Sequence, residues 1–107
     1  MNKFVKSILD PIGVPVANKT YLGNEQTYII FNIWSIPGLH ADDMEIQTDY
    51  TVQIDIFSPG NLTNLAKQAK NRMIAAGFMR SYENEEYVEE AKLFRKIFRF
   101  KYSREVE

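Results

Sequence analysis

The sequence predicts an α+β domain: a mostly antiparallel sheet of about four strands, with one main helix and a short N-terminal helix packed on it. Two patterns predict this class. Residues 49–57 alternate apolar and polar side chains, as a strand does, whereas residues 59–76 place apolar side chains three and four positions apart, as a helix does. A chain of 107 residues can bury one core but not two, so we expect a single domain over residues 1–107.

The first element expected is a short helix over residues 3–9, whose apolar residues recur at helical spacing. Pro11 ends it, because proline disfavours helical geometry in the residue before it. Residues 14–16 form a short extended piece. Pro15 cannot donate a hydrogen bond to a strand ladder, so this piece is expected to be an edge or no strand at all.

A pair of strands is expected next. Residues 27–35 are rich in β-branched and aromatic residues on both parities, which is typical of a strand covered on both faces. Residues 49–57 are expected to pair with them in antiparallel fashion. Between the two, Pro37 breaks the first strand, and residues 39–46 have no clean period, so we expect a long connection there.

The main helix is predicted over residues 59–76. Ser58 supplies a short polar side chain that can cap free amides, and Pro59 stands where its missing N–H costs nothing. Gly77 stands where a helix end favours left-handed geometry, and Phe78 can fold back onto the last turn.

The C-terminal part is expected to hold two strands. Residues 78–82 form a short strand, and the acid-rich residues 83–90 form a loop or a helical turn. Residues 93–102 form a long strand in which the aromatic residues share one face with the core and the basic residues share the other.

Composition excludes several classes of function. The chain is 45% hydrophobic and 25% charged, which is typical of an ordinary globular protein. Its net charge of −1 gives no overall field toward nucleic acid or an anionic membrane. It has no cysteine, which removes disulfides, thiolate zinc sites and thiol nucleophiles. No apolar run approaches the roughly 20 residues of a membrane span, so no membrane contact is expected.

No catalytic, cofactor-binding or metal-binding residue is expected. His40 is the only histidine and stands beside Asp42 and Asp43, but a tight metal site usually needs three or more ligands at fixed spacing. Asp55, in a hydrophobic strand, could have a raised pKa and do acid–base work. The favoured interpretation places it on the wetter face of its strand beside Gln53. An enzyme is therefore not predicted.

Two charged segments are candidates for contacts between molecules. Arg95, Arg99 and Lys101 form a basic stripe on the last strand. The acidic segment contributes Glu83, Glu85, Glu86, Glu89 and Glu90. Patches of opposite sign on different faces suit head-to-tail contacts between identical subunits, which close into rings. The alternative is that both are simply soluble surface. Because the aromatic residues of the last strand share the core parity, a base-stacking platform is not favoured.

The middle of the chain resembles a known family. Residues 50–58 (Tyr-Thr-Val-Gln-Ile-Asp-Ile-Phe-Ser), a turn, and a helix over residues 62–76 that closes on a Gly-Phe pair resemble the central signature of the tail-completion, or tail-terminator, proteins of long-tailed phages. Strands at residues 28–31 and 94–102 fall where that family has its own. The chain is short for the family, and residues 39–46 contain no motif that matches it.

The resemblance implies a structural protein without cofactor or chemistry. It implies a ring, commonly a hexamer, that caps the tail tube, stops its growth and docks to the head connector, with DNA only as passing cargo. The partners would be the chain itself, the tail-tube protein and a head-completion or connector protein. The location would be the virion tail, after assembly in the host cytoplasm.

Two hypotheses on contacts follow, beside one alternative function. The acidic segment of one subunit would meet the basic stripe of the next, and a loop would dock to tail or head partners. The candidate docking residues are Leu39, His40, Asp42, Asp43 and Met44. The alternative is a small non-enzymatic binding module, either a regulator or a nucleic-acid binder that uses the basic C-terminal strand.

Overall fold

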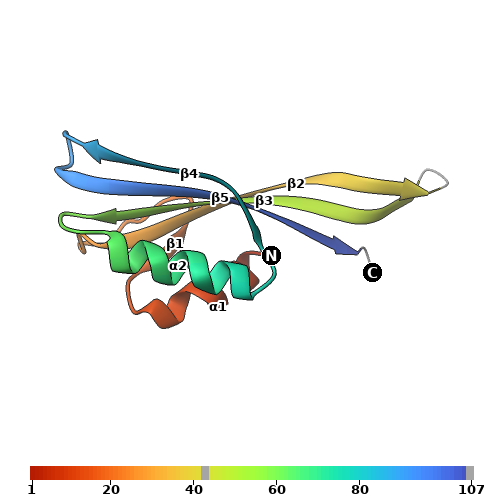
Figure 1. Cartoon of the computed structure of the whole chain (residues 1–107), viewed down its shortest axis with the longest axis horizontal. Coiled ribbons are helices and arrows are strands. Elements are labelled where there is room, and N and C mark those ends of the chain that lie inside the picture. Colours follow the sequence, from red (N-terminus) through yellow and green to blue (C-terminus); the bar gives the residue numbers. More distant parts are fainter. Residues whose placement is uncertain (42–43, 106–107) are drawn as a thin grey trace.

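The structure, a computed structural model, describes residues 1–41 and 44–105 and has two helices on one face of a five-stranded sheet (Figure 1). The elements in chain order are α1 (Asn2–Leu9), the short 3₁₀ helix η1 (Asp10–Ile12), β1 (Val16–Asn18), β2 (Tyr28–Ala41), β3 (Met44–Ser58), α2 (Thr63–Ala75), β4 (Met79–Val88) and β5 (Leu93–Glu105). The predicted α+β class is thus the observed one, with five strands where about four were expected.

The strands follow the order β1-β2-β3-β5-β4 across the sheet. All neighbours are antiparallel except β1, which runs parallel to β2. The extra strand is β1, which begins directly after Pro15. Proline lacks an N–H but keeps its carbonyl, and the carbonyl oxygen of Pro15 accepts the N–H of Ile29 at 2.8 Å. A proline at the start of an edge strand is therefore compatible with pairing.

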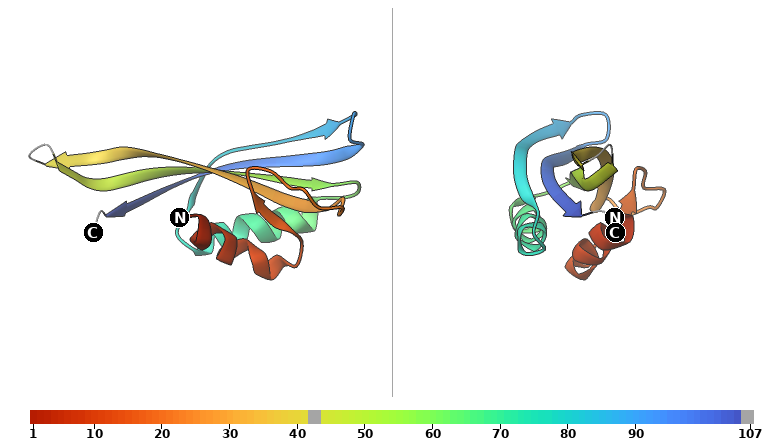
Figure 2. Two further views of the ribbon diagram at one scale, coloured as in Figure 1. Left: turned by 180° about the vertical axis from the view of Figure 1, so that it is seen from behind. Right: turned by 90° about the vertical axis from the view of Figure 1, so that its right-hand side faces the viewer.

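Strands β2 and β3 are longer than expected and run through most of the segment predicted as a connection. The register shifts between Pro37 and Leu39 and again between Leu39 and His40, and the pairing continues to Ala41. Pro37 is tolerated because none of the described strands pairs with this part of β2 on its outer side. The far halves of β2 and β3, with the end of β5, extend past both helices as an arm (Figures 1 and 2).

The candidate docking residues fall at the end of this arm. The structure places Leu39 and His40 in β2 and Met44 in β3, so they belong to strands and not to a loop. Asp42 and Asp43 lie outside the described residues. The prediction that the strand over residues 27–35 is covered on both faces is wrong, because both helices lie on the same face and Trp34, on the other, is 52% exposed.

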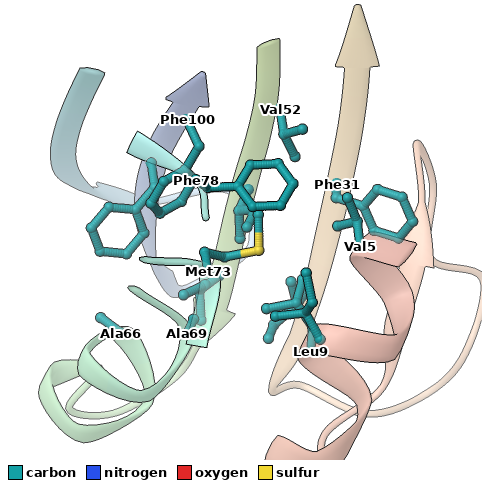
Figure 3. Packing of buried hydrophobic residues seen from close by; sticks show 14 of the residues in the cluster. Val5, Leu9, Phe31, Val52, Ala66, Ala69, Met73, Phe78 and Phe100 are labelled. Atoms are coloured by element: carbon teal, nitrogen blue, oxygen red, sulfur yellow. The ribbon is translucent and has the colours of Figure 1, made fainter. Parts of the chain in front are cut away.

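The core lies between the sheet and the two helices, and Figure 3 shows it from close by. Helix α1 contributes Val5 and Leu9, and α2 contributes Ala69 and Met73, all completely buried. Figure 3 shows these residues facing Phe31, Val52, Phe78 and Phe100. Helix α1 is also tied to α2 by a hydrogen bond of 2.6 Å, which Arg72 donates through Nε to the carbonyl oxygen of Ile8.

Helix α2 begins four residues later than the expected start at residue 59. The hydroxyl of Ser58 accepts the N–H of Gly60 at 3.2 Å, so it stabilises a turn before the helix and not the helix itself. Asn61 Oδ1 accepts the N–H of Thr63 at 2.8 Å, and the helix starts there. At the other end Gly77 has a φ of 103°, the left-handed region expected after a helix.

The acidic segment is a strand, which corrects the expectation of a loop or helical turn over residues 83–90. Strand β4 continues past the predicted short strand over residues 78–82, and its first nine residues are exposed. It therefore shows no alternation of apolar and polar residues from which a strand could be recognised. Pairing with β5 and ion pairs to it hold β4 in place.

Candidate interaction surfaces of the sheet

The face of the sheet that points away from α1 and α2, called here the helix-free face, is built from rows of side chains in register. Each row takes one residue from β2, β3, β5 and β4 in turn. Two neighbouring rows are Asn32, Gln53, Arg99 and Tyr82, then Trp34, Thr51, Lys101 and Met79. This face therefore combines cations from β5 with aromatic and apolar side chains from the outer strands.

Two cations of the predicted basic stripe are exposed on this face and bind only neutral groups among the described residues. Arg99 donates to Gln53 Oε1 at 2.9 Å, and its guanidinium carbon lies 5.0 Å from the centre of the Tyr82 ring. Lys101 donates to the hydroxyl of Thr51 at 2.8 Å. Neither charge has a described ion pair, although the charge of Lys101 also helps to lower the pKa of Asp49. Arg99 and Lys101 can therefore still receive an acidic partner.

The pattern of β5 alone does not reveal that aromatic side chains share the basic face. The rings come from other strands: Tyr82 is the β4 partner of Arg99, and Trp34 stands two strands from Lys101. The expectation that the aromatic residues of the last strand share the core parity is confirmed for Phe98 and Phe100, but it did not extend to the rings of the neighbouring strands. Only the register between strands could have shown it.

The third cation, Arg95, is used within the chain. Its guanidinium group lies 3.1 Å from Asp55 and 2.9 Å from Glu86, so it joins β3, β5 and β4. Burial alone would lower the pKa of Arg95, but the hydrogen bond to Glu86 and the charge of Asp55 outweigh it and raise that pKa. Asp55 is on the helix-free face beside Gln53, as predicted. It is only 5% exposed, so water has little access to it there.

The acidic strand β4 lies beside the basic strand β5, and its glutamates are divided between the two faces of the sheet. Glu86 shares the helix-free face with Arg95, whereas Glu83 and Glu85 line the groove beside α2. Glu83 pairs with Lys96 at 2.8 Å and also with Arg80. The hydrogen bond from Lys96 is the main reason why the pKa of Glu83 is lowered, and Arg80 adds to it against the effect of burial. Of the acidic residues, Glu85, Glu89 and Glu90 are exposed and have no described ion pair.

A groove of about 330 Å³ separates α2 from β4. Its charged lining residues are Lys67, Lys70, Glu83, Glu85 and Lys96. Glu83 and Lys96 are already paired with each other across it. Charges of both signs therefore line this groove, beside the polar side chains of Thr63 and Asn71.

Within residues 1–41 and 44–105, no group of three or more His, Asp or Glu side chains could hold a metal ion. No described helix is long and apolar enough to cross a membrane.

The arm contains one carboxylate with a shifted pKa. The hydroxyl of Ser103 donates to Asp49 at 2.6 Å, and this hydrogen bond, with one from Gln47, lowers the pKa of Asp49.

Comparison with known proteins finds similarity in structure only. No protein-family model matches the chain, and no curated protein is similar to it in sequence. Its fold is similar to that of a chain in the virion of a native gene transfer agent particle, with a TM-score of 0.61 and 15% identity, over 95% of this chain and 84% of that one. A second solved structure, described without a function, has a TM-score of 0.57 and 11% identity over 100% of this chain and 88% of that one. At these identities the likeness shows the fold alone.

Proposed function

We propose that this chain is a structural subunit of a phage-like virion, and more closely a tail terminator that forms a ring at the end of the tail tube and joins it to the head connector. The observation that carries the proposal is the fold, which a component of a gene transfer agent virion shares over 95% of this chain. Fold alone does not fix a function. The sequence pattern over residues 50–78 adds the resemblance to tail-terminator proteins.

The surface chemistry supports a role without catalysis. Arg95 pairs with Asp55 and Glu86 and so holds three strands together, and charges of both signs line the groove beside α2. The exposed charges and the apolar residues of the outer strands are suited to contacts with other proteins. We therefore propose that these surfaces contact other proteins, as those of an assembly subunit do.

The charged contact between subunits stays a prediction. Fewer residues are available for it than were predicted from the sequence. Ion pairs within the chain occupy Glu83, Glu86 and Arg95. The residues left for a contact with a neighbour are Glu85, Glu89, Glu90, Arg99 and Lys101. The arm is the element proposed to dock to the tail tube or the connector, because its strands extend past the helices and carry the candidate docking residues (Figure 1).

The test is the mass of the protein in solution, measured by light scattering over a concentration series, alone and with a tail-tube protein. A terminator is expected to give a defined ring in at least one of the two conditions, and to stop growth of the tube when added to it. A protein that stays monomeric in both, and leaves tube length unchanged by electron microscopy, would contradict the proposal.

Nucleic-acid binding is the second candidate, and one observation favours it. Tyr82 and Trp34, which are 42% and 52% exposed, share the helix-free face with Arg99 and Lys101. Aromatic rings beside cations can stack on bases and bind phosphates. Binding to single-stranded DNA that weakens steeply with salt would favour this function, because neutralised phosphates set that slope. Absence of such binding at low salt would exclude it.

A further inference from the structure

The outer edge of β2 has no partner over the stretch that follows β1. Strand β1 pairs only with Ile29, Ile30 and Phe31, and the last bond to this edge runs from the N–H of Lys19 to the carbonyl of Phe31. Alternate residues of a strand turn their main-chain groups to the same edge. Ile33 and Ser35 therefore point their N–H and C=O groups outward, with no described strand to receive them.

This open edge also lacks the usual protection against association. Folded proteins shield edge strands with lysine, proline or bulges. From Tyr28 to Ile36 strand β2 contains no charged residue, and the proline and the register shift come only at Pro37. Trp34 is 52% exposed and Ile36 is 64% exposed, and both project on the helix-free face. An unshielded apolar edge of this kind indicates a surface that is covered in the assembled protein.

The opposite edge of the same sheet offers a matching surface. Strand β4 is the other edge, and Met79, at its start, is 71% exposed. Met79 and Trp34 are the two ends of one row, through Thr51 and Lys101. Strand β4 runs antiparallel to β2, because β2 is antiparallel to β3, β3 to β5, and β5 to β4. A second copy placed edge to edge would therefore continue the sheet as an antiparallel ladder.

We propose that the outer edge of β2 in one subunit, over residues 32–36, pairs with the outer edge of β4 in the next, near Met79. When the rows of the two subunits are aligned without a shift, the thioether of Met79 meets the ring of Trp34, which is a favourable contact of sulfur with an aromatic ring. A shift by one row brings Ile36 to Met79 and Trp34 to Tyr82, which is again an apolar pairing. The two partners are different edges of one chain, so the contact is head-to-tail and can close into a ring.

This inference rests on the proposed ring and names the strands that would form it. It uses a different surface from the predicted charged contact, in which Glu89 and Glu90 meet Arg99 and Lys101. Substitutions can therefore separate the two contacts.

The first experiment places a lysine on the β2 edge. The wild type is expected to give a multi-subunit mass by light scattering, and Ile36→Lys is expected to reduce it to that of a monomer. The circular dichroism spectrum should stay unchanged because Ile36 is exposed. The matched control is Ile74→Lys, which adds the same charge at a 48% exposed isoleucine on α2 and should leave the mass unchanged.

The second experiment uses the absence of native cysteine. The double variant Trp34→Cys with Met79→Cys, treated with a short bis-maleimide, should give a ladder of covalent multimers. The pair Trp34→Cys with Ile74→Cys should not.

Three results would overturn the proposal. Dimers from Trp34→Cys alone would indicate a symmetric β2–β2 contact. If the wild type forms a ring, Ile36→Lys leaves the ring intact and the Trp34→Cys with Met79→Cys variant gives no ladder, the edge contact is rejected but the ring itself is not. A wild-type protein that stays monomeric with and without tube protein would reject both.

Discussion

At the scale of single residues, the most constrained group is Asp55. It is 5% exposed on a face that no helix covers, and Arg95 is the cation that neutralises it. Removing one partner of a buried ion pair leaves an uncompensated charge, which costs more than the pair contributes. Because the Arg95 side chain is 29% exposed, water can compensate part of this loss.

We therefore expect Arg95→Met to lower the free energy of unfolding by about 2 kcal/mol at pH 7, measured by urea denaturation. Arg99→Met, which removes an exposed guanidinium from the same strand, should cost less than about 1 kcal/mol. Adding Asp55→Asn to Arg95→Met should recover part of the loss, because it removes the orphaned charge. If the double variant shows the simple sum of the two single losses, the coupling between these residues is refuted.

Glu83 makes the stability depend on pH. Its pKa in the folded chain is lowered from the ordinary value of 4.5, first by the hydrogen bond from Lys96, with Arg80 and Lys70 adding to the effect. A lowered pKa means that the stabilisation is fully present above the unfolded value and is lost as the pH falls through the folded value. Glu83→Gln should thus lower stability at pH 7 and make it less dependent on pH below about 4.5.

The measurement for Glu83 is urea denaturation of both proteins at pH 7 and pH 3.5. Glu25→Gln, at an exposed position in the loop before β2, serves as the control and should behave like wild type. Equal losses of stability for Glu83→Gln at the two pH values would show that the carboxylate charge has no part in holding β4.

At the scale of elements, the end of α2 depends on one residue. Gly77 has a φ of 103°, and the N–H of Phe78 reaches back to the carbonyl of Met73 at 3.1 Å to close the helix. A side chain at this φ is strained, and a Cβ there would also lie 3.3 Å from the ring of Tyr102. Gly77→Ala should therefore lower the melting temperature, at a cost of about 1 to 2 kcal/mol.

Gly60 provides the matched control for that prediction. It has no positive φ, and a Cβ there would meet nothing within 4 Å. Gly60→Ala should change stability by no more than about 0.5 kcal/mol in either direction. Equal melting temperatures for the two alanine variants would contradict the role given to Gly77.

The elements that the sequence predicts are those with a local signal. Helix α2 has apolar residues at helical spacing and a glycine after its end, and β3 alternates strictly, so both were predictable. Strand β1 has three residues and is defined by its pairing with Ile29, Ile30 and Phe31 of β2. Strand β4 exposes its first nine residues and is defined by pairing with β5. The pairing that defines these two strands left no periodic pattern in their own sequences.

The same limit applies to the candidate surfaces. The basic residues could be assigned to one face from the parity of β5. Their surroundings could not, because the neighbours of Arg99 and Arg95 come from β3 and β4, at positions fixed by register. The burial of Asp55 has the same origin. The sequence therefore predicted where charges of one sign cluster. The pairing of strands decided which of those charges form ion pairs within the chain and which remain available to a partner.

At the scale of the whole molecule, the fold separates a stable body from an extended arm. The helices cover only part of a molecule 52 Å long, and the rest of the sheet continues without them (Figure 2). The part of β2 beyond β1 and the outer edge of β4 have no partner strand among the described residues, and both carry exposed apolar side chains. A sheet with two open edges is suited to lateral association of several copies of the chain, as proposed above for β2 and β4.

The final prediction concerns the charged contact within such a ring. Glu89 and Glu90 lie in the turn between β4 and β5 and have no described ion pair, so reversing them leaves the fold intact. If they meet Arg99 and Lys101 of the next subunit, Glu89→Lys with Glu90→Lys should weaken the ring by like-charge repulsion, and 0.5 M salt should relieve the effect. Arg99→Glu with Lys101→Glu should do the same. A variant that carries all four reversals restores opposite charges across the contact and should recover the ring mass in native mass spectrometry. Rings unaffected by either double reversal would exclude this contact and leave the strand edges as the surface that joins the subunits.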